Sequence, residues 1–107
     1  MKTELPACPV ETALTLIGEK WKILIIFSLL DETKRFGQLK SSLGSISQKV
    51  LTQQLRAMEK DGLVSRKVYA EVPPRVEYSL TKIGMSIKPI LDVMYEWGED
   101  YKRKMSE

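Results

Sequence analysis

The proline pair Pro73-Pro74 constrains the fold of this chain more than any other feature of its sequence. Residues 64–69 before the pair and residues 75–80 after it alternate in side-chain character, as strands with one buried face do. Proline has no backbone N–H to donate to a sheet, so residues 70–74 between the two stretches must form a loop. The sequence therefore predicts a β-hairpin with a stiff tip.

The segment before the hairpin has the features of an amphipathic helix. Leu51, Leu55 and Met58 are spaced as on one buried helical face. Ser47 is of a residue type preferred at the N-cap, and Gly62 suits the left-handed position that follows many helices. We therefore expect a helix that begins after Ser47, ends before Gly62 and packs its apolar face on the core.

Taken along the chain, such patterns predict one α+β domain that is mainly helical. The expected elements within residues 1–107 are a first helix over 8–17, a core helix over 19–30, a helix-turn-helix over 35–61, a hairpin over 63–80 and a C-terminal helix over 81–104. A helix pair closed by a glycine turn and followed by a hairpin is typical of a winged helix-turn-helix. In that fold the second paired helix enters the major groove of DNA.

Two further expectations concern the helices. The core helix is apolar on nearly every side after Lys22, so neighbouring elements should surround it. Pro89 should kink or split the C-terminal helix, because proline lacks the N–H that a helical hydrogen bond needs.

The solvent face of the helix after Ser47 suits an anionic partner. It carries amides, a hydroxyl and cations, and no carboxylate occurs before Glu59. Such side chains can hydrogen-bond base edges and phosphates, and the hairpin adds three cations. The candidate DNA-binding residues are Ser47, Gln48, Lys49, Thr52, Gln53, Arg56, Arg66, Lys67 and Arg75. Two alternatives stay open: a merely solvated helix face, and a winged helix that binds an acidic protein instead of DNA.

The composition argues against an enzyme. The chain has no histidine and one cysteine, so a zinc site, a Cys-His pair and a serine triad with its usual base all lack parts. We expect no catalytic residues, no metal and no cofactor. The net charge of +3 mildly favours nucleic acid as a partner. No signal peptide is recognisable and the apolar run over 23–30 is too short for a bilayer, so we expect a cytoplasmic protein without membrane contact.

Several segments of the chain, taken together, resemble one known family. Residues 46–81, ISQKVLTQQLRAMEKDGLVSRKVYAEVPPRVEYSLT, resemble the recognition helix and wing of the HxlR-type winged-helix transcriptional regulators of bacteria. The similarity extends to CPVETALTLIGEKWKILII at residues 8–26 and to Trp97 and Gly98. The resemblance implies a dimeric, cytoplasmic protein that binds DNA as a repressor or an activator. It also implies a dimer interface formed by the N- and C-terminal helices.

The apolar residues of the C-terminal segment favour a homodimer on their own account. They repeat at helical spacing and form a stripe longer than a domain of this size can cover. We expect Ile83 and Ile87 to pack on their own domain and residues 94–101 to reach a second copy. A two-fold dimer would present two recognition helices to a pseudo-palindromic operator with half-sites roughly 34 Å apart.

Cys8 is a candidate redox-sensing residue. It precedes Pro9 at the start of the first helix, where free N–H groups and the helix dipole favour a thiolate, although Glu11 partly opposes this. A cysteine at this place can sense electrophiles or oxidants in HxlR-like regulators, so the resemblance implies a thiol switch. A small, inert side chain buried at the dimer interface explains Cys8 equally well.

Overall fold

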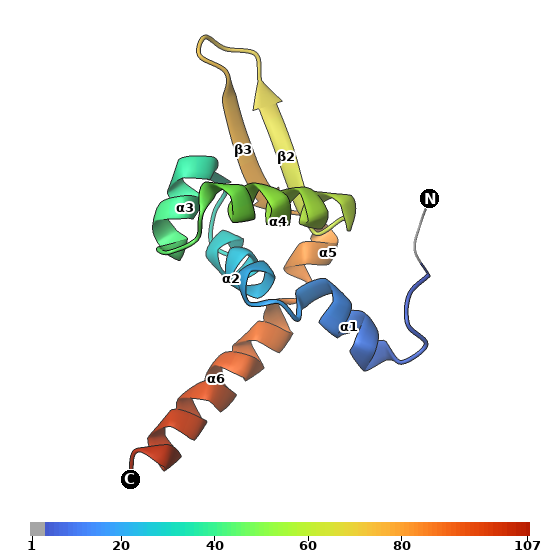
Figure 1. Ribbon diagram of the computed structural model, residues 1–107, viewed down its shortest axis with the longest axis vertical. Coiled ribbons are helices and arrows are strands. Elements are labelled where there is room, and N and C mark those ends of the chain that lie inside the picture. The colour runs from blue at the N-terminus through green and yellow to red at the C-terminus, as the bar shows by residue number, and fades with distance from the viewer. Residues whose placement is uncertain (1–3) are drawn as a thin grey trace.

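The computed structural model describes residues 4–107, and Figure 1 shows how its helices and strands are arranged. In chain order the elements are α1 (Pro9–Ile17), α2 (Lys20–Leu29), β1 (Lys34–Arg35), α3 (Phe36–Leu43), α4 (Gln48–Lys60), β2 (Val64–Tyr69), β3 (Arg75–Leu80), α5 (Lys82–Met85) and α6 (Lys88–Met105). The hairpin of β2 and β3 rises beyond α4, and α6 extends away from the body in the opposite direction (Figure 1). The predicted winged helix-turn-helix is confirmed.

Local signals explain where α4 begins and ends. The Ser47 hydroxyl accepts a hydrogen bond from the backbone N–H of Val50 at 3.1 Å, so the predicted N-cap is confirmed. Gly62 follows the helix with a φ of 81°, a conformation that glycine adopts without steric strain. Gly44 has a φ of 74° in the turn between α3 and α4, which allows the tight connection of the paired helices.

The core lies where α2, α3 and α4 meet the base of the hairpin. Its largest fully buried side chains are Ile25, Ile26, Leu39, Leu51 and Met58. Burial of a side chain of this size stabilises the fold by about 1.5–3 kcal/mol. Phe27 of α2 nevertheless remains 48% exposed and stacks on Tyr95 of α6, with ring centroids 6.3 Å apart. The expectation that neighbouring elements surround α2 therefore holds only in part, because α6 covers this side of the helix incompletely in the single chain.

The sheet has three antiparallel strands in the order β1-β3-β2, one strand more than the sequence predicts. β2 and β3 form the expected hairpin, in which Arg66 lies opposite Tyr78. The additional strand β1 pairs Lys34 with the other side of Tyr78. A strand of two residues is too short to display an alternating pattern, which is why the sequence does not reveal it.

The C-terminal segment forms two helices, so the helix expected over 81–104 is split into α5 and α6, which is one of the two outcomes expected from Pro89. The Thr81 hydroxyl caps α5 by accepting the backbone N–H of Gly84 at 3.0 Å. α6 begins at Lys88 and has Pro89 in its first turn, where the missing N–H removes no helical hydrogen bond. The segment thus splits before Pro89 and does not bend around it.

A close approach of the backbone orients the short helix α5. Gly84 is buried against the carbonyl oxygen of Leu63, which would lie 2.2 Å from a Cβ at this position. Because Gly84 turns its side of α5 toward the domain, the neighbouring Ile83 faces away and is 64% exposed. The expectation that Ile83 packs on its own domain is therefore wrong, whereas Ile87 does pack against the core.

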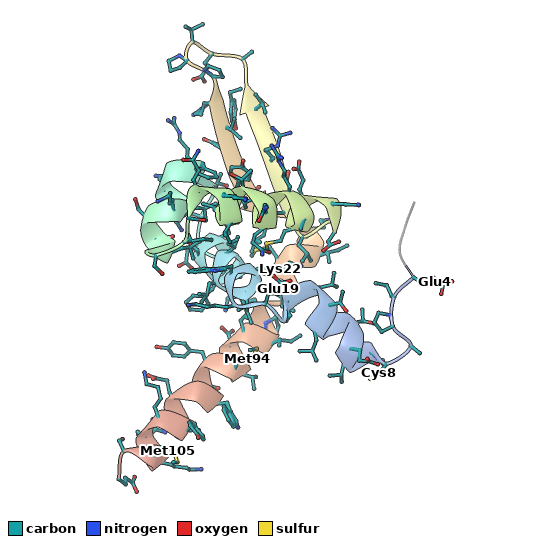
Figure 2. All side chains as sticks on the ribbon, in the orientation of Figure 1. Glu4, Cys8, Glu19, Lys22, Met94 and Met105 are labelled. Carbon is teal, nitrogen blue, oxygen red and sulfur yellow. The ribbon has the colours of Figure 1, made fainter. Side chains whose placement is uncertain are left out.

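The outer part of α6 leaves the body of the molecule. Figure 2 shows Met94 and Met105 along the part of α6 that extends away from the other helices. The buried side chain of this helix is Leu91, near its start. Trp97 is 67% exposed and stacks on Tyr101 with centroids 5.4 Å apart. The apolar stripe from Met94 to Tyr101 is thus not covered by its own domain.

Candidate nucleic-acid interface

α4 presents a row of polar side chains on the face opposite its buried residues. The row consists of Lys49, Gln53, Arg56 and Lys60, which follow one another at i, i+4, i+7 and i+11. All four side chains are exposed, and no acidic residue lies within the row. Lys60 is missing from the predicted set, although its spacing of four residues from Arg56 places it on the same face.

The N-terminus of α4 carries two of the predicted residues. Gln48 is exposed at the first helical position, so its amide is free to contact a ligand. The Ser47 oxygen already accepts the N–H of Val50, which leaves its hydroxyl hydrogen to donate. The free N–H groups and the helix dipole at this end favour an anion.

Thr52 lies on the side of α4 that faces the hairpin. It is half-buried and borders a hollow of about 200 Å³ between α4 and the hairpin. The residues that line this hollow are Thr52, Leu55, Arg56, Glu59, Arg66 and Tyr78. The structure therefore separates Thr52 from Lys49 and Gln53 and places Arg56 at the border between the outward row and the hollow.

The three hairpin cations lie on two different faces of the sheet. Arg66 is the cross-strand partner of Tyr78 and borders the hollow beside α4, where its Nε lies 3.5 Å from Oε1 of Glu59. Lys67 follows Arg66 directly and therefore belongs to the other face, as does Arg75 by its register. The structure does not bring the three predicted cations together.

Arg75 is held by neighbours within the hairpin. Its guanidinium nitrogens lie 3.0 Å from a carboxylate oxygen of Glu71 and 3.4 Å from one of Glu77. The guanidinium carbon also lies 3.9 Å from the ring centroid of Tyr69. These two carboxylates compensate the charge of Arg75, so it presents less positive potential than the sequence suggests.

Burial raises the pKa of Tyr78 above its ordinary value of about 10. The positive charges of Arg66 and Arg56 act in the opposite direction, while the negative charge of Glu59 adds to the increase. The hydroxyl of Tyr78 therefore stays protonated near neutral pH and can donate a hydrogen bond.

A further polar surface, absent from the predicted set, lies at the start of α3. Arg35, Gln38 and Ser41 are exposed there and border a surface hollow together with Gly37. The backbone N–H of Arg35 donates to Oε1 of Gln38 at 2.8 Å, which closes the first turn of the helix. The signal that could have identified this surface is its place in the motif, because the first helix of the pair crosses the DNA backbone.

A polar contact ties α4 to the start of α2. The Nε2 group of Gln54 donates to Oε1 of Glu19 at 3.1 Å, and Nζ of Lys22 lies 4.0 Å from Oε2 of the same glutamate. Figure 2 places Glu19 and Lys22 close together where α2 begins, below α4. α4 is thus positioned by this contact as well as by its buried side chains.

Cys8 lies away from the DNA-binding candidates in space (Figure 2). It is the N-cap residue of α1, and its side chain is exposed. Figure 2 shows it at the outer end of α1, away from α4 and the hairpin. The thiol is therefore accessible in the single chain, and any influence on α4 has to pass through α1.

Comparison with known proteins identifies the family. Residues 16–106 match the family model described as HxlR-like helix-turn-helix. The chain belongs to this family. The HTH-type transcriptional regulator YdeP of Bacillus subtilis is 44% identical over 104 residues, which are 97% of this chain and 81% of YdeP. The predicted resemblance is confirmed, and this HxlR-like chain is a winged-helix transcriptional regulator.

Solved structures of a redox regulator and of a transcriptional regulator are similar to the HxlR-like chain over nearly its whole length. The redox regulator HypR in its reduced form is 45% identical with a TM-score of 0.87, and the match covers 92% of this chain and 98% of HypR. The reduced form of the transcriptional regulator YodB from Bacillus subtilis is 35% identical with a TM-score of 0.79, covering 90% and 95%. Within residues 4–107, no helix combines the length and apolar character that a membrane crossing requires.

Proposed function

We propose that the protein is a cytoplasmic homodimer that binds a pseudo-palindromic duplex operator, with α4 in the major groove of each half-site. The observation that carries this proposal is the outward row of α4, which is exposed, rich in hydrogen-bond donors and free of acidic residues. A major groove about 12 Å wide admits one α-helix. Lysine, arginine and glutamine side chains can then bind the acceptors of guanine and adenine or the flanking phosphates.

The candidate residues divide into two roles. Gln48, Lys49 and Gln53 lie in the first half of α4 and contact base edges, because the N-terminal residues of a recognition helix reach deepest into the groove. The phosphate contacts are assigned to Ser47, Thr52, Arg56, Lys60 and Arg66. Lys67 and Arg75, on the outer face of the hairpin, contact the neighbouring backbone or minor groove.

A second copy of the chain is the partner that the apolar helices require. The exposed apolar residues of α1 and α6 include Val10, Leu14, Ile90, Val93, Met94, Trp97, Tyr101 and Met105. Exposed apolar surface of this extent is typical of interaction sites. In a two-fold dimer this patch of one chain packs against the same patch of the other chain. The two α4 helices are then separated by the distance between adjacent half-sites.

Fluorescence anisotropy of a labelled duplex of random sequence tests the DNA-binding proposal. We expect affinity to fall steeply as salt rises, because phosphate contacts release counterions. Lys49→Ala should weaken binding to every duplex, because it removes a positive charge from the helix that lies between the two phosphate backbones. Lys102→Ala, near the end of α6, is the control and should leave the affinity unchanged. An affinity that does not depend on the salt concentration, or that is equal for wild type and Lys49→Ala, contradicts the proposal and favours a protein-binding module.

We further propose that thiol modification of Cys8 alters DNA affinity. The support is the exposed position of Cys8 at the N-cap of α1 and the similarity to regulators named for redox control. With one cysteine in each chain, a disulfide would have to join the two protomers. Treatment with a thiol oxidant should change the operator affinity of the wild type and leave Cys8→Ser unaffected. Equal responses of the two proteins would remove this proposal.

A further inference from the structure

The hollow between α4 and the hairpin is lined by polar side chains from both elements. Thr52 reaches it from α4, and Tyr78 reaches it from the hairpin. Both residues are half-buried, and within residues 4–107 neither hydroxyl oxygen is among the fully buried polar atoms that lack a partner. Both hydroxyl groups are thus open to the solvent in the hollow, where a ligand can replace the water molecules that now satisfy them. The two hydroxyls therefore suit a ligand that accepts hydrogen bonds.

The charge of the hollow indicates the kind of ligand. Arg56 and Arg66 bring two guanidinium groups to its border, and Glu59 brings one carboxylate. Glu59 lies 3.5 Å from Nε of Arg66, and the Arg66 side chain is 45% exposed, so its terminal N–H groups are open to another acceptor. Two cations and two hydroxyls against one carboxylate make a site for a singly charged group with several acceptor oxygens, such as a phosphate.

We infer that this hollow binds one backbone phosphodiester of the DNA strand that passes between α4 and the hairpin. The inference rests on the proposed function, because a strand can pass there only when α4 lies in the major groove. Arg66 and the hydroxyl groups of Thr52 and Tyr78 donate to the phosphate oxygens. Glu59 holds Arg66 beside α4 in the free protein and competes with the phosphate for it. The recognition helix and the wing then hold the same phosphate.

Tyr78→Phe removes one oxygen atom and keeps the ring. We expect about tenfold weaker operator binding, since hydrogen bonds to charged groups are among the stronger ones. The loss should be the same for every duplex sequence, because phosphate contacts carry no base information. Tyr69→Phe, on the opposite face of the hairpin, is the matched control and should bind as the wild type does. Equal affinities of Tyr78→Phe and wild type would overturn the inference.

Operators in which single phosphates are replaced by neutral methylphosphonates locate the contact. We expect one position in each half-site where the replacement weakens wild-type binding by about tenfold and where Tyr78→Phe causes little further loss. If Tyr78→Phe causes the same additional loss at every position, the hydroxyl does not contact a phosphate and the inference fails. Should Tyr78→Phe not fold by circular dichroism, Thr52→Val takes its place in both experiments.

Glu59→Gln tests the role of the carboxylate. We expect severalfold tighter binding and a steeper salt dependence, because Arg66 loses its competing partner and the phosphate loses a repelling charge. Weaker binding of Glu59→Gln would mean that the complex needs the carboxylate, which contradicts the assignment of the hollow to a phosphate.

The failure of this site and the failure of the proposed function give different results. A wild type that does not bind duplex DNA refutes the function, and the site falls with it. If the wild type binds and Lys49→Ala weakens binding while Tyr78→Phe does not, the function stands and only the phosphate site fails. Inorganic phosphate should compete with the operator no better than chloride at equal ionic strength. Binding of inorganic phosphate that Tyr78→Phe abolishes, together with an operator affinity that Tyr78→Phe leaves unchanged, would assign the hollow to a free anion and overturn the inference.

Discussion

α4 and α6 are both amphipathic helices, but they differ in how much of their apolar face is buried in the domain itself. α4 has 13 residues and buries Leu51, Leu55 and Met58 in its own domain. α6 has 18 residues, and its buried side chain is Leu91. What α4 leaves exposed is polar and cationic, whereas α6 exposes an apolar stripe beside its charged residues, with Trp97 as the largest apolar side chain.

The difference indicates what each helix lacks in the single chain. α4 is fully packed, so its exposed donors are available for a hydrogen-bonding, anionic ligand without any change in the fold. The exposed face of α6 has little to gain from water, and it is stabilised when another apolar surface covers it. In the proposed function α4 serves recognition and α6 serves assembly, so substitutions in the two helices should affect different measurements.

The largest effect should come from the buried face of α4. Leu51→Ala leaves a cavity in the core and should lower the free energy of unfolding by about 2–5 kcal/mol. Urea denaturation followed by circular dichroism measures this change. A loss below about 0.5 kcal/mol, the usual size for surface substitutions, would mean that α4 is not packed as described.

A somewhat smaller effect is expected on the exposed face of α6. Trp97→Glu places a charge in the proposed interface and should weaken dimerisation by about 2–4 kcal/mol, because buried tryptophans are frequent interface hot spots. Sedimentation equilibrium gives the dimer dissociation constant. Glu99→Gln, on the opposite face of the same helix, should leave it unchanged. A monomeric wild type, or a dimer dissociation constant that Trp97→Glu leaves unchanged, would contradict the proposed role of α6 in dimerisation.

Substitutions in the outward row of α4 should affect DNA binding and leave the stability of the fold nearly unchanged, in contrast to substitutions on its buried face. Gln53→Ala should change the free energy of unfolding by less than about 0.5 kcal/mol. The same variant should lose about 1–3 kcal/mol of discrimination between the operator and single-base variants at one position. Anisotropy titrations with a set of mutated operators measure this loss. An unfolding change as large as that of Leu51→Ala would show that Gln53 supports the fold and does not read DNA.

The smallest effect concerns Tyr78 at high pH. Its pKa is raised in the folded chain, so above pH about 10 the unfolded chain loses this proton first and the wild type becomes less stable. Below that pH both states hold the proton, and the contribution is constant. Tyr78→Phe lacks this titration, so its stability relative to the wild type should increase as pH rises above about 10. A relative stability that stays constant over this range would contradict the raised pKa.

Much of the fold follows from signals that lie within a few residues of one another. The N-cap at Ser47, the left-handed Gly62 and the spacing of Leu51 and Leu55 are local features, and they place α4 correctly. The strand β1 depends on a distant partner, Tyr78, and has no local pattern of its own. The exposure of Ile83 depends on the contact of Gly84 with Leu63, which adjacent residues do not reveal.

The candidate site is only partly predictable for the same reason. The outward row of α4 follows from helical spacing, and the same spacing already identifies Lys60. The alternation of side chains along a strand places Arg66 and Lys67 on opposite faces, so their separation was available from the sequence. The compensation of Arg75 by its neighbours and the hollow beside Tyr78 depend on the packing of the hairpin against α4 and could not be derived from spacing.

Selection of bound sites from a pool of random duplexes tests the central claim most directly, because it reports at once on recognition by α4 and on assembly through α6. We predict enrichment of an inverted repeat whose half-site centres lie about 10 base pairs apart. Single sites, direct repeats or no enrichment at all would contradict a two-fold dimer that places one α4 helix in each of two neighbouring major grooves.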